Sequence, residues 1–309
     1  MGINMKIKFT RYKKFYYILS GLMCLVSLAV IVFLGLVPGI EFAGGSVLEV
    51  QYEDSKPTTE EVVAKLESEG LHEVNVQPLG EDSFLIKVRE TEEETYEVMT
   101  SALEKAEVKQ FESIGPTVGS ELKEKSVIAI IVASLLVVFY ISIIFKQKSG
   151  SISSFRYGVI ATGIAFFHDM LIIVGVFSVL GYLYDVSVTV PIVVALLTTL
   201  GYSLNDTVVV FDRIRENLRS KEKDKEEQSD RGEVEVVVDK SLNEILGRSL
   251  STSFTTLLVL FSLLFLVGGD IYYFVLALIL GVVLGTYSSI FLAGPLVLDW
   301  SRGPEKRLD

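Results

Sequence analysis

The sequence predicts an α-helical membrane bundle of six transmembrane helices, with a small α+β domain inserted between the first and second helices. Half of the 309 residues are hydrophobic and the mean hydropathy is +0.47, although 22% are charged, so the charges must be separated from long apolar runs. Several runs approach or exceed the ~20 residues that cross a hydrocarbon core. Between the first two runs, hydrophobic and polar residues alternate as in a soluble domain.

Six apolar runs are predicted to span the membrane, because each is long enough to cross about 30 Å of hydrocarbon. The first, second, fifth and sixth contain no charged residue. The third is interrupted only by His168 and Asp169, and the fourth contains Asp206. The predicted spans are residues 15–37, 127–145, 157–184, 186–211, 249–269 and 271–298.

Lysine and arginine near the span ends predict the orientation, because such residues are retained on the cytoplasmic side. Four basic clusters lie on one side if six helices alternate, whereas the opposite connections, 181–188 and 268–271, carry only Asp185 and Asp270. The clusters are Lys6, Lys8, Arg11, Lys13 and Lys14; Lys146, Lys148 and Arg156; Arg213, Arg215, Arg219 and Lys221; and Arg302, Lys306 and Arg307. Both termini are therefore predicted to be cytoplasmic.

This orientation divides the chain into segments. They are a basic cytoplasmic N-terminus 1–14, helix 1 at 15–37, an extracytoplasmic domain 38–124, helices 2–4 within 125–211, a cytoplasmic loop 212–248, helices 5–6 within 249–298 and a cytoplasmic tail 299–309. The first apolar run is too long for a secretory signal and lacks an Ala-x-Ala-like exit, so it is predicted to be an uncleaved anchor. Residues 220–233 are rich in charged residues and serine without apolar periodicity, which predicts a mobile loop.

The extracytoplasmic segment is predicted to be ferredoxin-like. Alternating residues predict strands at 46–52, 73–79, 83–89 and 108–114. Helices are predicted at 57–70, which has a threonine cap and a terminal glycine, and at 91–106, which has acids in its first turn. The order is β-α-β-β-α-β, a ferredoxin-like topology that hosts many functions and identifies none.

Charge and cysteine content exclude several classes of function. Residues 38–124 contain 21 acidic and 7 basic residues, so this segment is more negative than the whole chain, whose net charge is −11. Such a surface repels nucleic acid and is typical of a solvated face, so no nucleic-acid partner is expected. Cys24 is the only cysteine and lies in the first apolar run, which excludes a disulfide in the domain and a cysteine metal cluster. No cofactor or metal is predicted.

Asp206 is the most informative residue, because an ionised aspartate at the centre of a membrane helix costs roughly 2.5 to 3.5 kcal/mol. Such residues usually face a bundle interior and handle ions or protons. Helical periodicity predicts that a polar face points inward, and its members are Thr198, Thr199, Tyr202, Asn205 and Asp206. Arg213 follows seven residues later, about 10 Å along the helix. The alternative is an aspartate that only bonds a neighbouring helix.

Other polar residues in the spans have two interpretations each. His168 and Asp169 either extend a proton path or hold helices together, and they point about 100° apart on a helix. No nucleophile motif accompanies the two histidines, which argues against a hydrolase. Gly281, Gly285, Ser289 and Ala293 recur at four-residue intervals and predict close helix packing, and the hydroxyls of 249–256 either pack or pass water and protons. Arg248, by position alone, is a positive-inside anchor.

Four motifs together resemble one known family. They are GYSLNDTVVVFDRIREN at 201–217, His168-Asp169, GPTVG at 115–119 and RSLSTSFTT at 248–256. The chain carrying them resembles SecF, the smaller membrane subunit of the SecDF protein-export complex in the RND superfamily. Residues 41–46, EFAGGS, depart from the family's Asp-Phe-x-Gly-Gly-Thr motif at the acid and at the last hydroxyl.

The resemblance implies a function and partners. It implies a non-enzymatic subunit of a complex that uses the proton motive force to assist protein translocation, in a bacterial or archaeal cytoplasmic membrane. Proton transfer at Asp206 would be coupled to movement of the extracytoplasmic domains, and the family match makes Arg248 its partner, with Tyr202, Asn205, His168 and Asp169 as further candidates. Six helices make half of an RND-type bundle, so a SecD-like half is implied, together with the SecYEG translocon, YajC, a translocating polypeptide and lipid. The alternatives are half of an RND-type small-molecule or lipid exporter and a purely structural translocon subunit.

Overall fold

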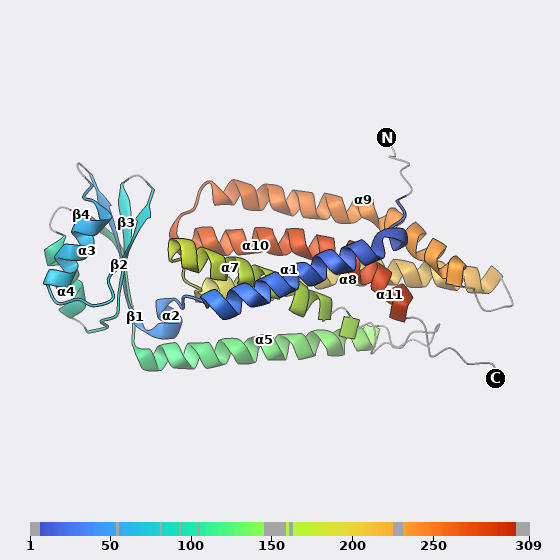
Figure 1. Cartoon of the computed structure of the whole chain (residues 1–309), viewed down its shortest axis with the longest axis horizontal. Helices are drawn as coiled ribbons and strands as arrows, with labels where there is room; N and C mark the ends of the chain where they lie inside the picture. Colours follow the sequence, from blue (N-terminus) through green and yellow to red (C-terminus); the bar gives the residue numbers. More distant parts are fainter. Residues whose placement is uncertain are drawn as a thin grey trace.

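The computed structural model describes residues 7–53, 56–80, 82–92, 94–103, 106–144, 159–160, 163–224 and 231–300. A long helical bundle carries a small sheet domain at one end, here called the domain end (Figure 1). Within the described residues, six helices are long and apolar enough to cross a membrane, and the four-stranded sheet lies between the first and second of them. The predicted fold class is therefore confirmed, and the chain is a multi-pass membrane protein.

The bundle consists of six long helices and several short helical turns. The long helices are α1 (Lys13–Leu34), α5 (Pro116–Ile144), α7 (Leu171–Tyr184), α8 (Val190–Asp224), α9 (Arg231–Leu264) and α10 (Gly269–Tyr287). The turns are η1 (Thr10–Tyr12), the π-helices η2 (Ile164–Met170) and η3 (Ser288–Ala293), and α11 (Gly294–Trp300). The predicted start of the third span, residue 157, lies outside the described residues.

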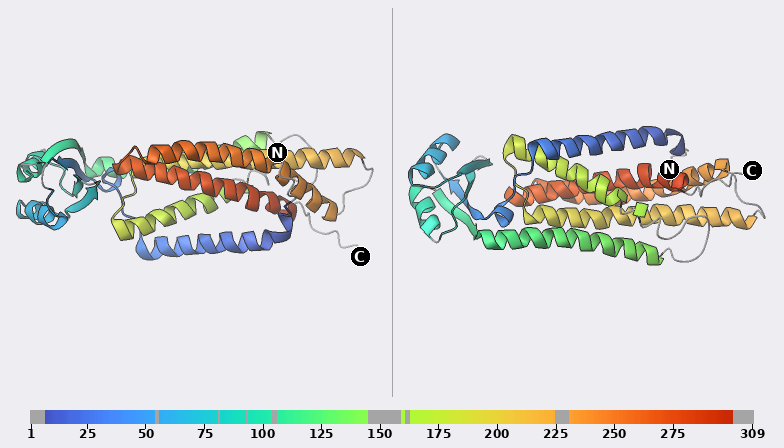
Figure 2. Two further views of the ribbon diagram at one scale, coloured as in Figure 1. Left: turned by 90° about the horizontal axis from the view of Figure 1, so that it is seen from above. Right: turned by 60° about the horizontal axis from the view of Figure 1, so that its bottom comes forward.

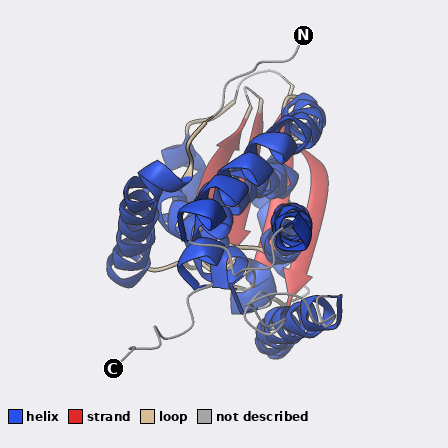
Figure 3. Ribbon diagram, turned by 90° about the vertical axis from the view of Figure 1, so that its right-hand side faces the viewer, coloured by secondary structure: helices blue, strands red, loops and turns tan. Residues whose placement is uncertain are grey.

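The sheet domain has the predicted β-α-β-β-α-β order. Its elements are β1 (Gly45–Tyr52), α3 (Thr59–Ser68), β2 (Asn75–Leu79), β3 (Ser83–Val88), α4 (Glu94–Ala102) and β4 (Ala106–Ile114). The sheet order is β2-β3-β1-β4 with every pair antiparallel, and the sheet lies across the domain end (Figure 3). Alternate residues of β1 and β3 are buried with apolar residues of both helices in one core, including Leu48, Ile86, Leu66 and Met99. This core holds the domain together without a disulfide.

Glycines make the junction between the domain and α5. A four-residue helix that sequence reasoning missed, α2 (Ile40–Ala43), precedes Gly44 and Gly45, which have φ values of +80° and +133°. A Cβ on Gly119 of α5 would lie 3.2 Å from the Phe42 carbonyl oxygen and from the Gly44 nitrogen. The positive φ favours glycine at 44 and 45, and the missing side chain of Gly119 allows the close backbone contact, so residues 41–46 and 115–119 pack together.

Helices α8 and α10 form the centre of the bundle. A Cβ added to Gly281 of α10 would lie 2.1 Å from Thr199 Oγ1, and one on Gly285 would lie 2.8 Å from Ser203 Cβ. The predicted close packing of small residues is thus confirmed. Helices α1 and α5 run along outer sides of the bundle (Figure 2). Phe33 of α1 and Phe265, which follows α9, are 84% and 86% exposed. These outer surfaces suit contact with lipid or with another membrane protein.

The end of the bundle remote from the sheet differs from the predicted loop. Residues 212–248 were expected to connect two spans as a loop, but α8 continues to Asp224 and α9 begins at Arg231 (Figure 1). The charged residues do not stop these helices, because apolar residues such as Ile214, Val238 and Leu242 still form a buried stripe between them. Similarly, α5 begins eleven residues before the predicted span at 127, because helix formation continues beyond the hydrocarbon.

We predict that Gly281→Val lowers the melting temperature of the detergent-solubilised protein, because a branched side chain cannot fit against Thr199. Overpacking of this kind costs about 1–3 kcal/mol. Gly201→Val is the matched control, because an added Cβ at Gly201 meets nothing within 4 Å. Equal melting temperatures for the two variants would contradict the proposed α8–α10 contact.

Candidate functional site

A buried polar network surrounds Asp169. This residue is 1% exposed, and its Oδ2 accepts hydrogen bonds from Ser203 Oγ at 2.6 Å and from Ser288 Oγ at 3.0 Å. Its Oδ1 contacts His168 Nδ1 at 2.7 Å. The carboxylate therefore joins η2 to α8 and η3, and both short helices are π-helical, a geometry frequent at functional sites.

Hydroxyl groups extend this network along α8. Ser289 Oγ donates to the Ser203 carbonyl at 3.1 Å and lies 2.8 Å from Thr207 Oγ1. Thr207 is adjacent in sequence to Asp206, so hydrogen-bonded groups lead from Asp169 to the neighbourhood of the second carboxylate. In an apolar environment a polar group is costly to bury unless it is hydrogen-bonded, and these hydroxyl groups provide hydrogen bonds to one another and to the backbone.

His168 faces a different element from Asp169, as their angular separation on a helix predicts. Its ring stacks on Tyr287 with centroids 5.8 Å apart, and the Tyr287 hydroxyl lies 3.0 Å from Ser20 Oγ of α1. Its Nε2 is buried and has no hydrogen-bond partner among the described residues. His168 thus links the network to the outer helix α1.

Asp206 is buried, and one of its carboxyl oxygens lacks a hydrogen-bond partner among the described residues. It is 6% exposed, and its Oδ2 accepts no hydrogen bond within the described part of the chain. Ser249 is also buried, and its Oγ likewise has no partner there. Ser249 and Arg248, at the same level of α9, are the polar residues whose side chains act on Asp206. This contrasts with Asp169, whose oxygens are both occupied.

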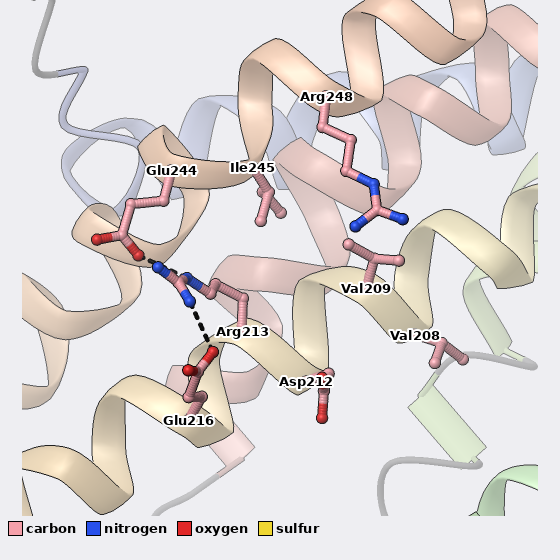
Figure 4. Close-up of a pocket in the computed structure, with 8 residues that line it drawn as sticks. All are labelled: Val208, Val209, Asp212, Arg213, Glu216, Glu244, Ile245 and Arg248. Atoms are coloured by element: carbon pink, nitrogen blue, oxygen red, sulfur yellow. Dashed lines mark hydrogen bonds and ion pairs between the residues drawn. The ribbon is translucent and has the colours of Figure 1, made fainter.

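A cavity of about 520 Å³ opens between α8 and α9 close to Asp206. Its lining includes Val209, Asp212, Arg213, Glu244 and Arg248 (Figure 4). Arg213 is neutralised by two acids: its Nε donates to Glu244 at 2.7 Å and its Nη1 to Glu216 at 2.6 Å. Arg248 extends toward α8 but forms no ion pair with Asp206 or with the other described acids within 4.0 Å. The cavity therefore contains one cation with an uncommitted guanidinium.

The structure places the predicted residues of α8 on two faces. Tyr202 is half-buried and its hydroxyl donates to Ser253 Oγ at 3.2 Å, but Asn205 and Thr198 are exposed, so the expectation that all five polar residues share an inward face is wrong. The inward polar face consists of Thr199, Ser203, Asp206 and Thr207. Their spacing of three, four and seven residues along α8 is the signal in the sequence that places Ser203 and Thr207 on the same face as Asp206.

Known protein families and named relatives match most of this chain. Residues 95–303 match the family described as Protein export membrane protein SecD/SecF, C-terminal, and residues 29–56 match the SecD/SecF GG Motif. Protein translocase subunit SecF of Thermobaculum terrenum is 37% identical to the chain over 95% of this chain and 94% of its own length. Protein translocase subunit SecF of Vibrio alginolyticus is 35% identical over 94% of this chain and 89% of its own length.

The chain belongs to the SecF family. Among solved structures, SecDF, a translocon-associated membrane protein from Thermus thermophilus, superposes with a TM-score of 0.82 and 30% identity over 97% of this chain. SecDF in a super-membrane-facing form gives a TM-score of 0.67 over the same share. The SecF-type chain spans only 39% of the length of each SecDF chain.

We predict that Ser203→Ala destabilises the SecF-type bundle, because Asp169 loses its shortest hydroxyl donor. The expected loss in the free energy of unfolding is on the order of 1 kcal/mol, as for other hydrogen bonds between membrane helices. Thr198→Ala is the control, since Thr198 is exposed and its hydroxyl bonds only to the Val194 carbonyl of its own helix. Thermal unfolding in detergent measures both, and an equal loss would show that the interhelical bond contributes nothing.

Proposed function

We propose that this chain is the SecF-type subunit of a complex that assists protein translocation and is driven by the proton motive force. Asp206 is the residue that binds and releases protons in this proposal. The observation that carries it is a buried carboxyl group whose Oδ2 accepts no hydrogen bond from the described residues. It lies near Arg248, a cavity-lining arginine that forms no ion pair with the acids the structure describes.

The electrostatics of this arrangement support a proton carrier. An apolar environment favours the neutral form of an acid, whereas a nearby cation favours the charged form. Arg248 acts on Asp206 but is not bonded to it, so a small change in their separation would alter which form is stable. By contrast, Asp169 already accepts two hydroxyl hydrogen bonds and contacts His168. We infer that Asp169 and His168 form a fixed polar support or relay beside the proton-binding residue.

The proton path has two parts in this proposal. In this proposal the proton passes between Asp206 and the cavity lined by Arg213 and Arg248, toward the end of the bundle remote from the sheet, which we assign to the cytoplasm. The hydroxyls of Thr207, Ser289 and Ser203 lead away from it within the bundle. A proton moving down the potential releases about 2.3 kcal/mol per 100 mV, enough to shift a conformational equilibrium by about fifty-fold.

The exposed surfaces and the SecDF comparison support a SecD-like partner in this proposal. Helices α5 and α9 present apolar side chains along most of their length, and this chain matches less than half of the SecDF chain. We propose that a SecD-like half-bundle covers part of these surfaces and that the pair associates with the SecYEG translocon, and with YajC, in a bacterial or archaeal cytoplasmic membrane. The sheet domain would then lie outside the cytoplasm and act on the translocating polypeptide.

We predict that Asp206→Asn removes the stimulation of protein secretion by the proton gradient, while the protein still assembles in the membrane. Asparagine preserves size but cannot carry the proton. The measurement is translocation into inverted membrane vesicles with and without a proton gradient. Asp212→Asn is the matched control, because Asp212 lies on the cavity rim and is exposed. Undiminished stimulation would eliminate the proton-carrier role, and loss of assembly would favour a purely structural subunit.

We predict that Arg248→Gln also abolishes gradient-dependent stimulation, whereas Arg248→Lys retains part of it, because lysine preserves the charge. Arg213→Gln, which removes a cation already neutralised by Glu216 and Glu244, should retain most of the activity. The same vesicle assay measures all three variants. Full activity of Arg248→Gln would refute the role of the guanidinium.

A further inference from the structure

A second cavity, of about 570 Å³, lies between α9 and the α10–η3 segment, in the half of the bundle remote from the sheet. It is called the lateral groove here. Its lining is largely apolar, and Leu250, Phe254 and Val283 are exposed on the outer surface of the bundle. The remaining lining residues are Ser251, Ser253, Leu257, Thr286, Tyr287 and Phe291. The lateral groove is therefore open to whatever surrounds the helices.

The buried hydroxyl groups at the floor of the lateral groove already have partners within the protein. Ser253 Oγ lies 2.6 Å from Thr286 Oγ1, and each also donates to a carbonyl of its own helix, at 2.9 and 2.7 Å. The Tyr287 hydroxyl lies 3.0 Å from Ser20 Oγ of α1. An apolar occupant suits such a floor, because none of these buried groups requires a hydrogen bond from it.

The lateral groove is too short for a partner helix that crosses the membrane. On α9 its lining extends from Leu250 to Leu257, a rise of about 10 Å at 1.5 Å per residue. A spanning helix would follow the bundle through about 30 Å of hydrocarbon. The length of the groove therefore corresponds to a chain that enters from one leaflet of the bilayer.

Residues 7–12, here called the crossing segment, pass from α1 to α9 at the end of the lateral groove remote from the sheet. Thr10 donates to the Asp239 carboxylate of α9 from both its N and its Oγ1, each at 2.9 Å. Phe9 is fully buried, and its ring centroid lies 5.7 Å from that of Phe291 in the groove lining. A helix that continued along the groove would meet this segment, whereas an acyl chain ends at its headgroup.

The crossing segment carries basic side chains that the protein leaves uncompensated. Lys8 and Arg11 are exposed and form no ion pair with the acids that the structure describes, whereas the following Lys13 is paired with Asp299. Lys8 is adjacent in sequence to Phe9, whose ring contacts the groove lining. Lysine and arginine at a membrane surface attract anionic lipids. The charge at this end of the groove therefore favours a negative headgroup.

We propose that the lateral groove binds one acyl chain of an anionic phospholipid, whose headgroup is held by Lys8 and Arg11 of the crossing segment. The apolar lining, its length of about one leaflet and the free cations at its end all fit this occupant. The site lies on the outside of the α9–α10 pair, so the proposal does not depend on proton transfer at Asp206.

The test is native mass spectrometry of the full-length chain in detergent, titrated separately with phosphatidylglycerol and phosphatidylcholine of identical acyl chains. One phosphatidylglycerol should bind at least about five-fold more tightly than phosphatidylcholine, as expected for basic residues at a membrane surface. Ser251→Phe, which places a ring in the groove, should remove this binding. Ser262→Phe is the matched control, because Ser262 is exposed on the same helix about 16 Å further along and does not line the groove.

Lys8→Gln separates headgroup binding from the fit of the chain, and it is the second variant if Ser251→Phe does not fold. It should weaken phosphatidylglycerol binding about five-fold and leave phosphatidylcholine binding unchanged. Lys123→Gln is the control, because Lys123 is an exposed lysine of α5 near the sheet. Equal affinities for the two lipids, or unaltered phosphatidylglycerol binding in Ser251→Phe or Lys8→Gln, would overturn the proposal.

A cross-linking experiment distinguishes the lipid from a protein occupant. Phe254, which is exposed in the lateral groove, is replaced by photoreactive p-benzoylphenylalanine, and the full-length protein is irradiated in its membrane. An adduct with phospholipid is expected. An adduct with another protein chain in its place would assign the groove to a partner or to a second copy, and would refute lipid binding. Neither readout involves secretion, so failure here is distinct from failure of the proton-carrier role.

Discussion

The close approach of α8 and α10 is the contact on which the membrane site depends. Glycines at 281 and 285 let the two backbones come close enough for Thr199 and Ser203 to lie in the interface. Because Ser203 also reaches Asp169, the packing of two helices fixes the position of a carboxylate on a third element. Because those glycines have no side chains, the two helices make close van der Waals contact and can also form hydrogen bonds. Both interactions are typical of membrane helices, whose association is not driven by the hydrophobic effect.

The two buried carboxylates show how an apolar solvent separates structural from reactive groups. Asp169 has hydrogen-bond partners from α8 and η3, which reduce the cost of its burial and join helices. Asp206 is nearly as buried, but its Oδ2 accepts no hydrogen bond from the described residues, and the cation that acts on it forms no ion pair with it. A satisfied acid stabilises one arrangement, whereas an unsatisfied acid responds to small changes in its surroundings. This difference supports assigning proton binding to Asp206.

A single helix connects the two ends of the molecule. Helix α8 follows directly on the connection that contacts the sheet domain, carries Ser203 and Asp206 through the bundle, and reaches the cavity at Arg213. Its 35 residues correspond to about 52 Å at 1.5 Å per residue. A rigid element of this length links the two ends mechanically. A shift of α8 near Asp206 would therefore also move the connection between α7 and α8, where Ser187 accepts a hydrogen bond from Lys87 of the sheet domain.

The sequence by itself determined the elements of this protein. Long uncharged runs indicated the spans, alternation indicated the sheet domain, and the position of Asp206 in an apolar run marked it for attention, because each of these signals is local along the chain. Local signals failed where partners are distant in sequence: Asn205 proved exposed, residues 212–248 proved largely helical, and Ser203 and Ser288 were missed. Only the tertiary structure decided that both oxygens of Asp169 are hydrogen-bonded, that Oδ2 of Asp206 has no partner among the described residues, and that Lys87 of the sheet domain lies near acids from separate segments. Hydrogen bonds and charge balance in a buried site depend on which helices meet, and spacing along one helix cannot supply that information.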